Sequence, residues 1–462
     1  MFSANAESTS IKPPVEMSRG WSNIVGILAG GIVAFSILLP LDIGFPRPFI
    51  FGRTISWTLI VTVFVVLVFA VLSSGTLRVA FASSYCVAMT AFAMMMLQSA
   101  LRAPSAYVLT SIQATAAFFC IFVGDYAIFR FAILCRSRRV MARTITTASV
   151  AAAGVGIVGA LAGATIAPYS GWYFDYFGIS PDIAVISRAL GTLNQPILFG
   201  TAMMLAIPFV IEISSKAIRY AALTIVLLAG VLTASRTILV LAFVFVVGSA
   251  LVNGARLFIR FAIALLLGLL IVQYVGVPSE WQSDPRVSFL MSRAGIGNDV
   301  VARTAVDNLQ LRRAAAAMAI DQIAGESTDD VFSFGVGRGY TTAGILGSRI
   351  NAQLATLDNT FVTLLYEEGL LGLLLFCTAF AVFLYESRAA SRTSLHWYAA
   401  LALLGTGVSF DFEAYTTFNV LAAASMAFAS IRIVEPAMST VKETPDQVLF
   451  ANDNRTTPRP VR

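Results

Sequence analysis

Two short polar clusters interrupt apolar stretches of the chain and carry residues that could bind an anion. One spans residues 187–196 and holds Arg188 and Asn194 directly before an apolar run, and the other is a turn at 232–237 that holds Arg236. Arginine binds phosphate oxygens through paired N–H groups, and a charge beside hydrocarbon is costly unless it is paired or functional. The clusters therefore indicate an anion site at a lipid surface. The structural alternatives are an ordinary Asn and Pro helix start, and arginines that extend toward water.

A third cluster lies in the long stretch 278–358, which holds Arg312 and the glycine-rich run 334–340 with Gly337 and Arg338. Glycines let a backbone approach a bulky ligand. The run is not a dinucleotide-binding fingerprint, because no strand and βαβ pattern surrounds it. A simple turn is the structural alternative. Earlier in the same stretch, the apolar periodicity over about 299–324 predicts a helix that Gly325 would end.

Asp358, Asn359 and Glu368 follow at the entry to the next apolar run. A carboxylate there could accept a proton from a hydroxyl group, and an asparagine could hold that hydroxyl in place. Glu368 is expected to lie a turn or more inside the helix, which takes it farther from this entry.

The composition requires a membrane protein. Hydrophobic residues make up 58% of the 462 residues and charged residues only 12%, and the mean hydropathy is +0.81. Apolar runs of about 18 or more residues recur, each long enough to cross a bilayer as a helix. Helices satisfy their own backbone in lipid, so we expect an all-α fold with about 12 transmembrane helices. The expected spans are about 21–40, 55–72, 79–99, 105–124, 144–167, 194–213, 218–234, 237–253, 257–277, 359–385, 395–410 and 414–432.

The orientation follows from a loop that is rich in arginine and has no acid. Short loops of this kind stay in the cytoplasm. Its arginines are Arg130, Arg136, Arg138, Arg139 and Arg143. Counting spans from this loop places three further basic pairs in the cytoplasm: Lys216 with Arg219, Arg256 with Arg260, and Arg388 with Arg392. Both chain ends are then cytoplasmic.

The chain therefore divides into five parts. We expect a cytoplasmic tail at 1–20, nine spans within 21–277, one large outer loop at 278–358, three spans within 359–432 and a polar, proline-rich disordered cytoplasmic tail at 433–462. The arginines of the large loop do not contradict this topology, since loops beyond about 60 residues escape the positive-inside rule. The first apolar run lacks a small-residue cleavage pattern, which favours an uncleaved span.

The four cysteines predict neither a metal site nor a disulfide, because no CxxC spacing is present. They are Cys86, Cys120, Cys135 and Cys377. We expect no metal and no cofactor.

The three clusters resemble motifs of the bacterial O-antigen ligase and Wzy-type polysaccharide (exopolysaccharide) polymerase superfamily, in the same order along the chain. The resemblance covers roughly residues 185–385. The residues that carry it are Arg188, Gly191, Asn194 and Pro196 in the first motif, Thr233, Ser235 and Arg236 in the second, and Gly335, Gly337, Asn359, Glu368, Gly369 and Gly372 in the third.

The resemblance implies a metal-free glycosyltransferase of the bacterial inner membrane, with a large periplasmic loop. Its substrate would be an oligosaccharide on undecaprenyl diphosphate. The expected partners are the bilayer, a flippase and a chain-length co-polymerase, with no nucleic acid. Arg188, Arg236 and one of Arg312 or Arg338 would bind the diphosphate and stabilise its leaving charge. Asp358 would orient or deprotonate the acceptor hydroxyl, held by Asn359.

One departure favours a polymerase over a ligase. Ligases commonly carry His-Asn before the last large-loop helix, whereas this chain has Asp358-Asn359. Its only histidine, His396, is expected at the cytoplasmic end of a later span and cannot replace the missing one. Either Asp358 is the base, or the reaction needs little base because diphosphate is already a good leaving group.

Three other functions remain open from the sequence. An O-antigen ligase would transfer the glycan to lipid A core instead of to a second lipid-linked unit. A transporter or flippase of polysaccharide export would have paired halves, broken spans and charges near the midplane, and the link at 73–78 lacks the basic signature of major facilitators. A structural or regulatory partner of an export system would not need the arginines.

Overall fold

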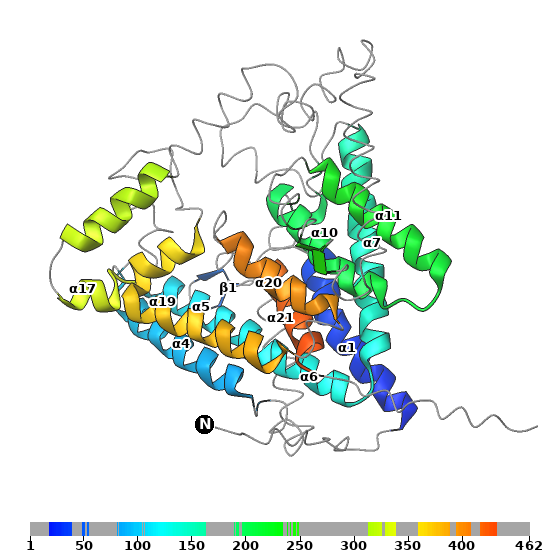
Figure 1. Cartoon of the computed structure of the whole chain (residues 1–462), viewed down its shortest axis with the longest axis horizontal. Coiled ribbons are helices and arrows are strands. Elements are labelled where there is room, and N and C mark those ends of the chain that lie inside the picture. The colour runs from blue at the N-terminus through cyan, green and yellow to red at the C-terminus, as the bar shows by residue number, and fades with distance from the viewer. Residues whose placement is uncertain are drawn as a thin grey trace, which may run out of the picture. The chain divides into compact units, whose positions relative to one another are not determined.

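The described part of the protein is all-helical apart from one minimal pair of strands, as the composition predicts (Figure 1). The computed structural model describes residues 18–38, 49–50, 53–54, 81, 83–103, 105, 107–162, 189, 191–193, 196–233, 238, 241, 244–245, 247–248, 313–325, 329–338, 359–388, 394–407 and 416–431. Strands β1 (Phe49–Ile50) and β2 (Arg53–Thr54) pair antiparallel.

The helices keep close to the predicted runs in most of these ranges. In chain order they are α1 (Arg19–Leu38), α4 (Ser84–Leu101), α5 (Val108–Phe119), the π-helical turn η1 (Cys120–Asp125), α6 (Tyr126–Leu134), α7 (Arg138–Ala162), the 3₁₀ turn η2 (Gly191–Leu193), α10 (Pro196–Ile211), α11 (Lys216–Leu232), α17 (Asp329–Phe334), α19 (Thr360–Glu386), α20 (Leu395–Gly407) and α21 (Thr416–Ser430). A further helix covers 313–325 and confirms the second half of the helix expected up to Gly325.

Five helices in the described ranges are long and apolar enough to cross a membrane. They are Gly20–Leu38, Ser84–Leu101, Ser111–Leu134, Arg138–Leu161 and Thr360–Glu386, and Ile197–Ile211 and Asn419–Ser430 are shorter apolar helices. The predicted spans 55–72 and 257–277 lie outside the described residues, and 237–253 is described only at single positions.

The predicted span 105–124 continues farther than expected. The helix runs on through η1 and α6 to Leu134, so Arg130 lies inside a helix and not in a loop. Arg138, Arg139 and Arg143 of the predicted loop lie inside α7. Asp125 interrupts the apolar run in the sequence, yet its side chain is fully buried. Phe129 and Phe131, which follow it in the helix, are buried as well. The π-helical turn at Cys120–Asp125 accommodates this junction. The connection to α7 is reduced to the three residues 135–137.

Helices α4 and α19 run antiparallel and side by side (Figure 1). Two hydrogen bonds fix their ends: the Ser84 backbone N–H donates to the Glu386 carboxylate at 3.0 Å, and the Ser99 hydroxyl donates to the Glu367 carbonyl at 2.7 Å. Edge-to-face aromatic contacts fill the space between them, with Phe92 and Phe376 ring centroids 5.3 Å apart. Both ends of this helix pair are therefore held in register.

Helices α1 and α7 approach closely through two glycines four residues apart. A Cβ atom on Gly26 would lie 2.9 Å from the Ser137 Cβ atom, and one on Gly30 would lie 2.8 Å from the Thr144 Cβ atom. Small residues at this spacing let helix backbones approach in a membrane. The first span therefore packs directly on α7, the helix that follows the link 135–137.

Candidate functional site

Helix α19 is broken at Gly369, where the backbone takes φ 72° and ψ −173°. A break of this kind leaves the carbonyls of the preceding turn without helical donors. The Val336 N–H donates to the Tyr366 carbonyl at 3.0 Å, and the Gly337 N–H donates to the Glu367 carbonyl at 3.1 Å. Residues 335–338, called the glycine segment below, therefore supply the hydrogen bonds that the break removes.

The glycine segment also joins α19 to α4 and α5. The Arg338 N–H donates to the Ser99 carbonyl at 3.2 Å in the last turn of α4. The Ser111 hydroxyl of α5 donates to the Arg338 carbonyl at 3.0 Å. Three helices thus meet at this one stretch of backbone.

The glycines are required by close backbone contact. Gly335 has φ 74°, and a Cβ atom there would lie 2.4 Å from the Glu367 carbonyl oxygen. Gly337 has φ 117°, and a Cβ atom there would lie 3.0 Å from the backbone of Arg102. The backbone N–H groups of residues 336–338 all donate to protein carbonyls. These residues therefore have a structural role in the site. This arrangement fits the turn that the spacing alone suggested.

Arg338 and Glu368 form a buried ion pair. The Arg338 Nη1 atom lies 2.7 Å from the Glu368 Oε1 atom, and the two residues are 6% and 0% exposed. Glu368 lies more than two turns inside α19, as the sequence suggested. Removing one partner of such a pair leaves an uncompensated buried charge, which costs about 3–5 kcal/mol. The pair therefore holds the glycine segment beside α19, next to the break at Gly369.

Asn359 is the N-cap of α19. Its side-chain oxygen accepts hydrogen bonds from the Phe361 N–H at 3.0 Å and the Val362 N–H at 3.2 Å. These bonds satisfy two of the free donors at the helix start. Asn359 thus sets where the helix begins, directly after Asp358.

Helix 313–325 packs on the first half of α19. Ala315, Ala319 and Ile323 form a small apolar cluster with Tyr366, and the Tyr366 hydroxyl lies 3.2 Å from the Gln322 Oε1 atom. Arg312 lies outside the described residues. The large loop is therefore attached to α19 both through this helix and through the glycine segment.

Arg102 is a functional candidate that the sequence reasoning missed. It is the C-cap residue of α4, and its guanidinium lies over the Phe334 ring, 5.1 Å from the centroid. A single arginine after an apolar run looks like any interfacial arginine. The one available signal was its position at the predicted outer end of the third span.

The first and second polar clusters meet through the backbone. The Ala189 N–H donates to the Leu232 carbonyl at 2.8 Å, and the Thr192 hydroxyl donates to the Ile37 carbonyl at 2.6 Å. Thr233 is fully buried. Ala189 follows Arg188, and Leu232 comes four residues before Arg236, so the bond brings the two motifs together. Five predicted site residues lie outside the described part of the chain: Arg188, Asn194, Arg236, Arg312 and Asp358.

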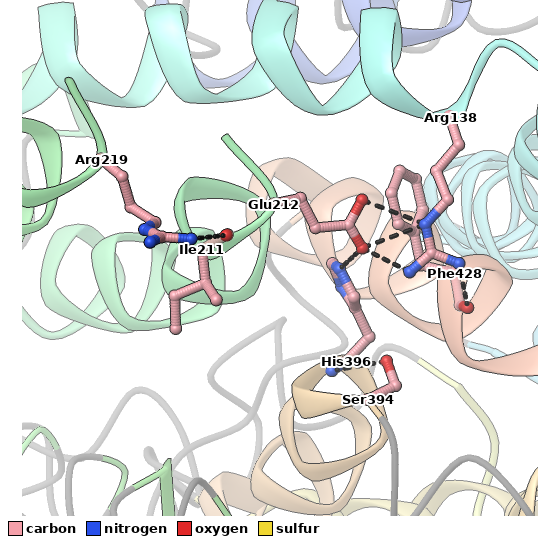
Figure 2. A network of polar contacts seen from close by, with 7 residues as sticks. All are labelled: Arg138, Ile211, Glu212, Arg219, Ser394, His396 and Phe428. Atoms are coloured by element: carbon pink, nitrogen blue, oxygen red, sulfur yellow. Dashed lines mark hydrogen bonds and ion pairs between the residues drawn. The ribbon is translucent and has the colours of Figure 1, made fainter. Parts of the chain in front are cut away.

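A separate polar cluster, which the sequence did not predict, lies where the ends of four other helices meet (Figure 2). Arg138 at the start of α7 forms an ion pair with Glu212, and Glu212 Oε1 lies 3.1 Å from His396 Nε2. The Arg138 guanidinium also lies over the Phe428 ring, 4.8 Å from its centroid. The His396 ring packs between Phe209 and Phe428, with centroids 4.5 and 4.6 Å away. His396 is thus buried in a cluster of its own.

Among the described residues, no group of three or more His, Cys, Asp or Glu side chains could hold a metal ion. All four cysteines are unpaired with one another. The described part of the site therefore consists of arginines, glycines, hydroxyl groups and carboxylates. No family model and no curated protein matches the chain.

Proposed function

We propose that the protein is a polysaccharide polymerase that joins undecaprenyl-diphosphate-linked oligosaccharide units at the periplasmic face of a bacterial inner membrane. The product would be an exopolysaccharide or an O-antigen. The acceptor hydroxyl oxygen forms a bond to the anomeric carbon of the donor, and the bond from that carbon to the diphosphate breaks. The electron pair leaves with undecaprenyl diphosphate, and the hydroxyl proton passes to Asp358 or to the leaving group.

The contacts between helices support the predicted topology, because each joins ends assigned to the same side from sequence. On the predicted periplasmic side these contacts are Ala189 with Leu232, Thr192 with Ile37, and Ser99 with Glu367. On the predicted cytoplasmic side they are Ser22 with Cys135, Ser84 with Glu386, and the Arg138–Glu212–His396 cluster.

The observation that carries the proposal is the hydrogen bond from the Ala189 N–H to the Leu232 carbonyl. It joins Ala189, the residue after Arg188, to Leu232, four residues before Arg236, at the predicted periplasmic ends of α10 and α11. Two arginines at a lipid surface can bind a diphosphate and stabilise the charge that develops as it leaves. Positive groups placed in advance for a developing charge are usually the largest contribution to catalysis.

The described third cluster supports the positioning that this reaction needs. Asn359 holds the start, and the Arg338–Glu368 pair the end, of the first half of the broken helix α19. Asp358 directly precedes this cap in the sequence, next to a defined helix start. We assign Arg338 a positioning role, because its guanidinium is held by Glu368.

The experiment replaces Arg188 and Arg236 singly by Ala in cells and follows surface polymer length, with membrane levels checked by immunoblot. We expect single repeat units in place of long chains. Arg219→Ala is the matched control, since this arginine lies on α11 at its opposite, predicted cytoplasmic end. Full-length polymer from both arginine variants at wild-type membrane levels would reject the assigned roles. A deletion strain separates the two enzymes, because loss of a ligase leaves normal free polymer and bare lipid A core.

A flippase of lipid-linked glycans is the second candidate. Transporters place broken helices and buried ionisable residues within the membrane, and this chain has a break at Gly369 and a fully buried Asp125. In a deletion strain, loss of a flippase would leave lipid-linked units on the cytoplasmic face. Loss of a polymerase would leave them as single units on the outer face.

A further inference from the structure

We propose that Arg102 is a further binding residue for the diphosphate of the lipid-linked donor. This inference rests on the proposed function and extends its site to α4. The resemblance of the chain to polymerases and ligases covers only residues from about 185 onward and does not reach this helix. The chemistry recognised would be a diphosphate carried on a polyprenyl lipid.

Arg102 lies against the glycine segment. A Cβ atom on Gly337 would lie 3.0 Å from both the carbonyl carbon and the carbonyl oxygen of Arg102. The Arg102 guanidinium lies 5.1 Å from the centroid of Phe334, the residue that directly precedes the segment. Arg102 therefore belongs to the same end of the bundle as Arg338, Ser99 and the first half of α19.

The two arginines at this end differ in what they can bind. Arg338 is 6% exposed and its guanidinium is paired with the Glu368 carboxylate. Arg102 is exposed and makes no ion pair within the described ranges, and its guanidinium face is positioned by Phe334. Glu367, which directly precedes Glu368, is buried at 3% exposure. Arg102 is thus the arginine with charge to offer a ligand arriving from the lipid surface.

The aromatic contact suits an anion-binding arginine. Stacking on the face of a ring leaves the in-plane N–H groups of a guanidinium directed outward. The ring contact also restricts the Arg102 side chain, so less conformational entropy is lost when a ligand binds. A hydrogen bond between charged groups is stronger than a neutral one, so loss of Arg102 should weaken diphosphate binding by about 10- to 100-fold.

The chain offers a matched control at the other end of α19. Arg388 is also exposed and lies over a ring, 4.0 Å from the centroid of Tyr385. It shares the chemistry of Arg102, but α4 and α19 are antiparallel, so it lies at the opposite end of the pair. A general attraction between interfacial arginines and anionic lipids would affect both residues equally.

The test measures binding of geranylgeranyl diphosphate to the purified full-length protein in phosphatidylcholine nanodiscs, where no anionic lipid competes. The variants are Arg102→Gln, Arg102→Lys and Arg388→Gln, and geranylgeranyl monophosphate and geranylgeraniol are the comparison ligands. We expect about 10- to 100-fold weaker diphosphate binding for Arg102→Gln, partial recovery for Arg102→Lys and wild-type binding for Arg388→Gln. Thermal unfolding of all three variants should match wild type, because both side chains are exposed.

The outcomes separate the two proposals. If the wild-type protein binds the diphosphate and Arg102→Gln binds it equally well, Arg102 has no binding role. The proposed function would then still stand. Equal weakening by Arg102→Gln and Arg388→Gln would reduce Arg102 to a general interfacial charge and reject the inference. Wild-type protein that binds the diphosphate no better than the alcohol would count against the inference and the proposed function together.

Discussion

Removing the Glu368 carboxylate would take from the Arg338 guanidinium an ion-pair partner at a buried site. The paired atoms are 2.7 Å apart, with side chains 7% and 0% exposed. At that burial we expect Glu368→Leu and Arg338→Met each to lower the free energy of unfolding by about 3–5 kcal/mol. The double variant Arg338→Met/Glu368→Leu removes both charges, and we expect it to lie within about 2 kcal/mol of wild type.

Reversible unfolding of the purified full chain in mixed micelles, followed by far-UV circular dichroism, would measure these differences. The coupling energy from the double-mutant cycle should be at least about 3 kcal/mol, because each single variant strands the other partner. Arg388→Met removes an exposed arginine from the other end of the helix and should change the free energy of unfolding by less than about 0.5 kcal/mol. Single variants within about 1 kcal/mol of wild type would refute the reasoning that this pair holds the glycine segment in place.

Two further predictions concern backbone geometry, with the same unfolding measurement. Gly30→Ala would place a Cβ atom 2.8 Å from the Thr144 Cβ atom and should destabilise the protein by about 1–3 kcal/mol. In the control, Gly31→Ala, the added Cβ atom has no neighbour within 4 Å, so this change should be neutral or stabilising. Equal losses of unfolding free energy in both variants would contradict the packing of α1 on α7. Arg136 has φ 62° in the link between α6 and α7, and Arg136→Gly should stabilise the protein by about 0.5–1 kcal/mol because glycine adopts this conformation without strain. Arg139→Gly, inside α7, should do the opposite, and stabilisation by both changes would show that strain at Arg136 is not the cause.

The helical class and several helix ends could be predicted because they depend on local composition. The expected spans 395–410 and 218–234 correspond closely to α20 (Leu395–Gly407) and α11 (Lys216–Leu232). The continuation of α5 into α6 could not be predicted, since an acid within an apolar run signals an end unless its burial is known. Asp125 is such an acid.

The polar pairings depend on three-dimensional contacts between distant residues. Arg338 and Glu368 are 30 residues apart and meet only because the helix breaks at Gly369. Glu212 and His396 are 184 residues apart. The sequence supplied the residues of the glycine segment but not their function, because no local pattern shows that its N–H groups complete a helix. The roles of Arg188, Arg236 and Asp358 remain predictions.

The glycine segment and the Asn359 cap have a consequence for how this protein could diversify. Residue 338 is held beside Glu368, and the chain returns to the same helix at Asn359. These two attachment points are nine residues apart along α19, or about 14 Å at helical rise. The length between them could change at little cost, since doubling a loop adds only about 0.6 kcal/mol of closure entropy. A stretch of another length between residues 338 and 359 would therefore meet α19 at the same two points.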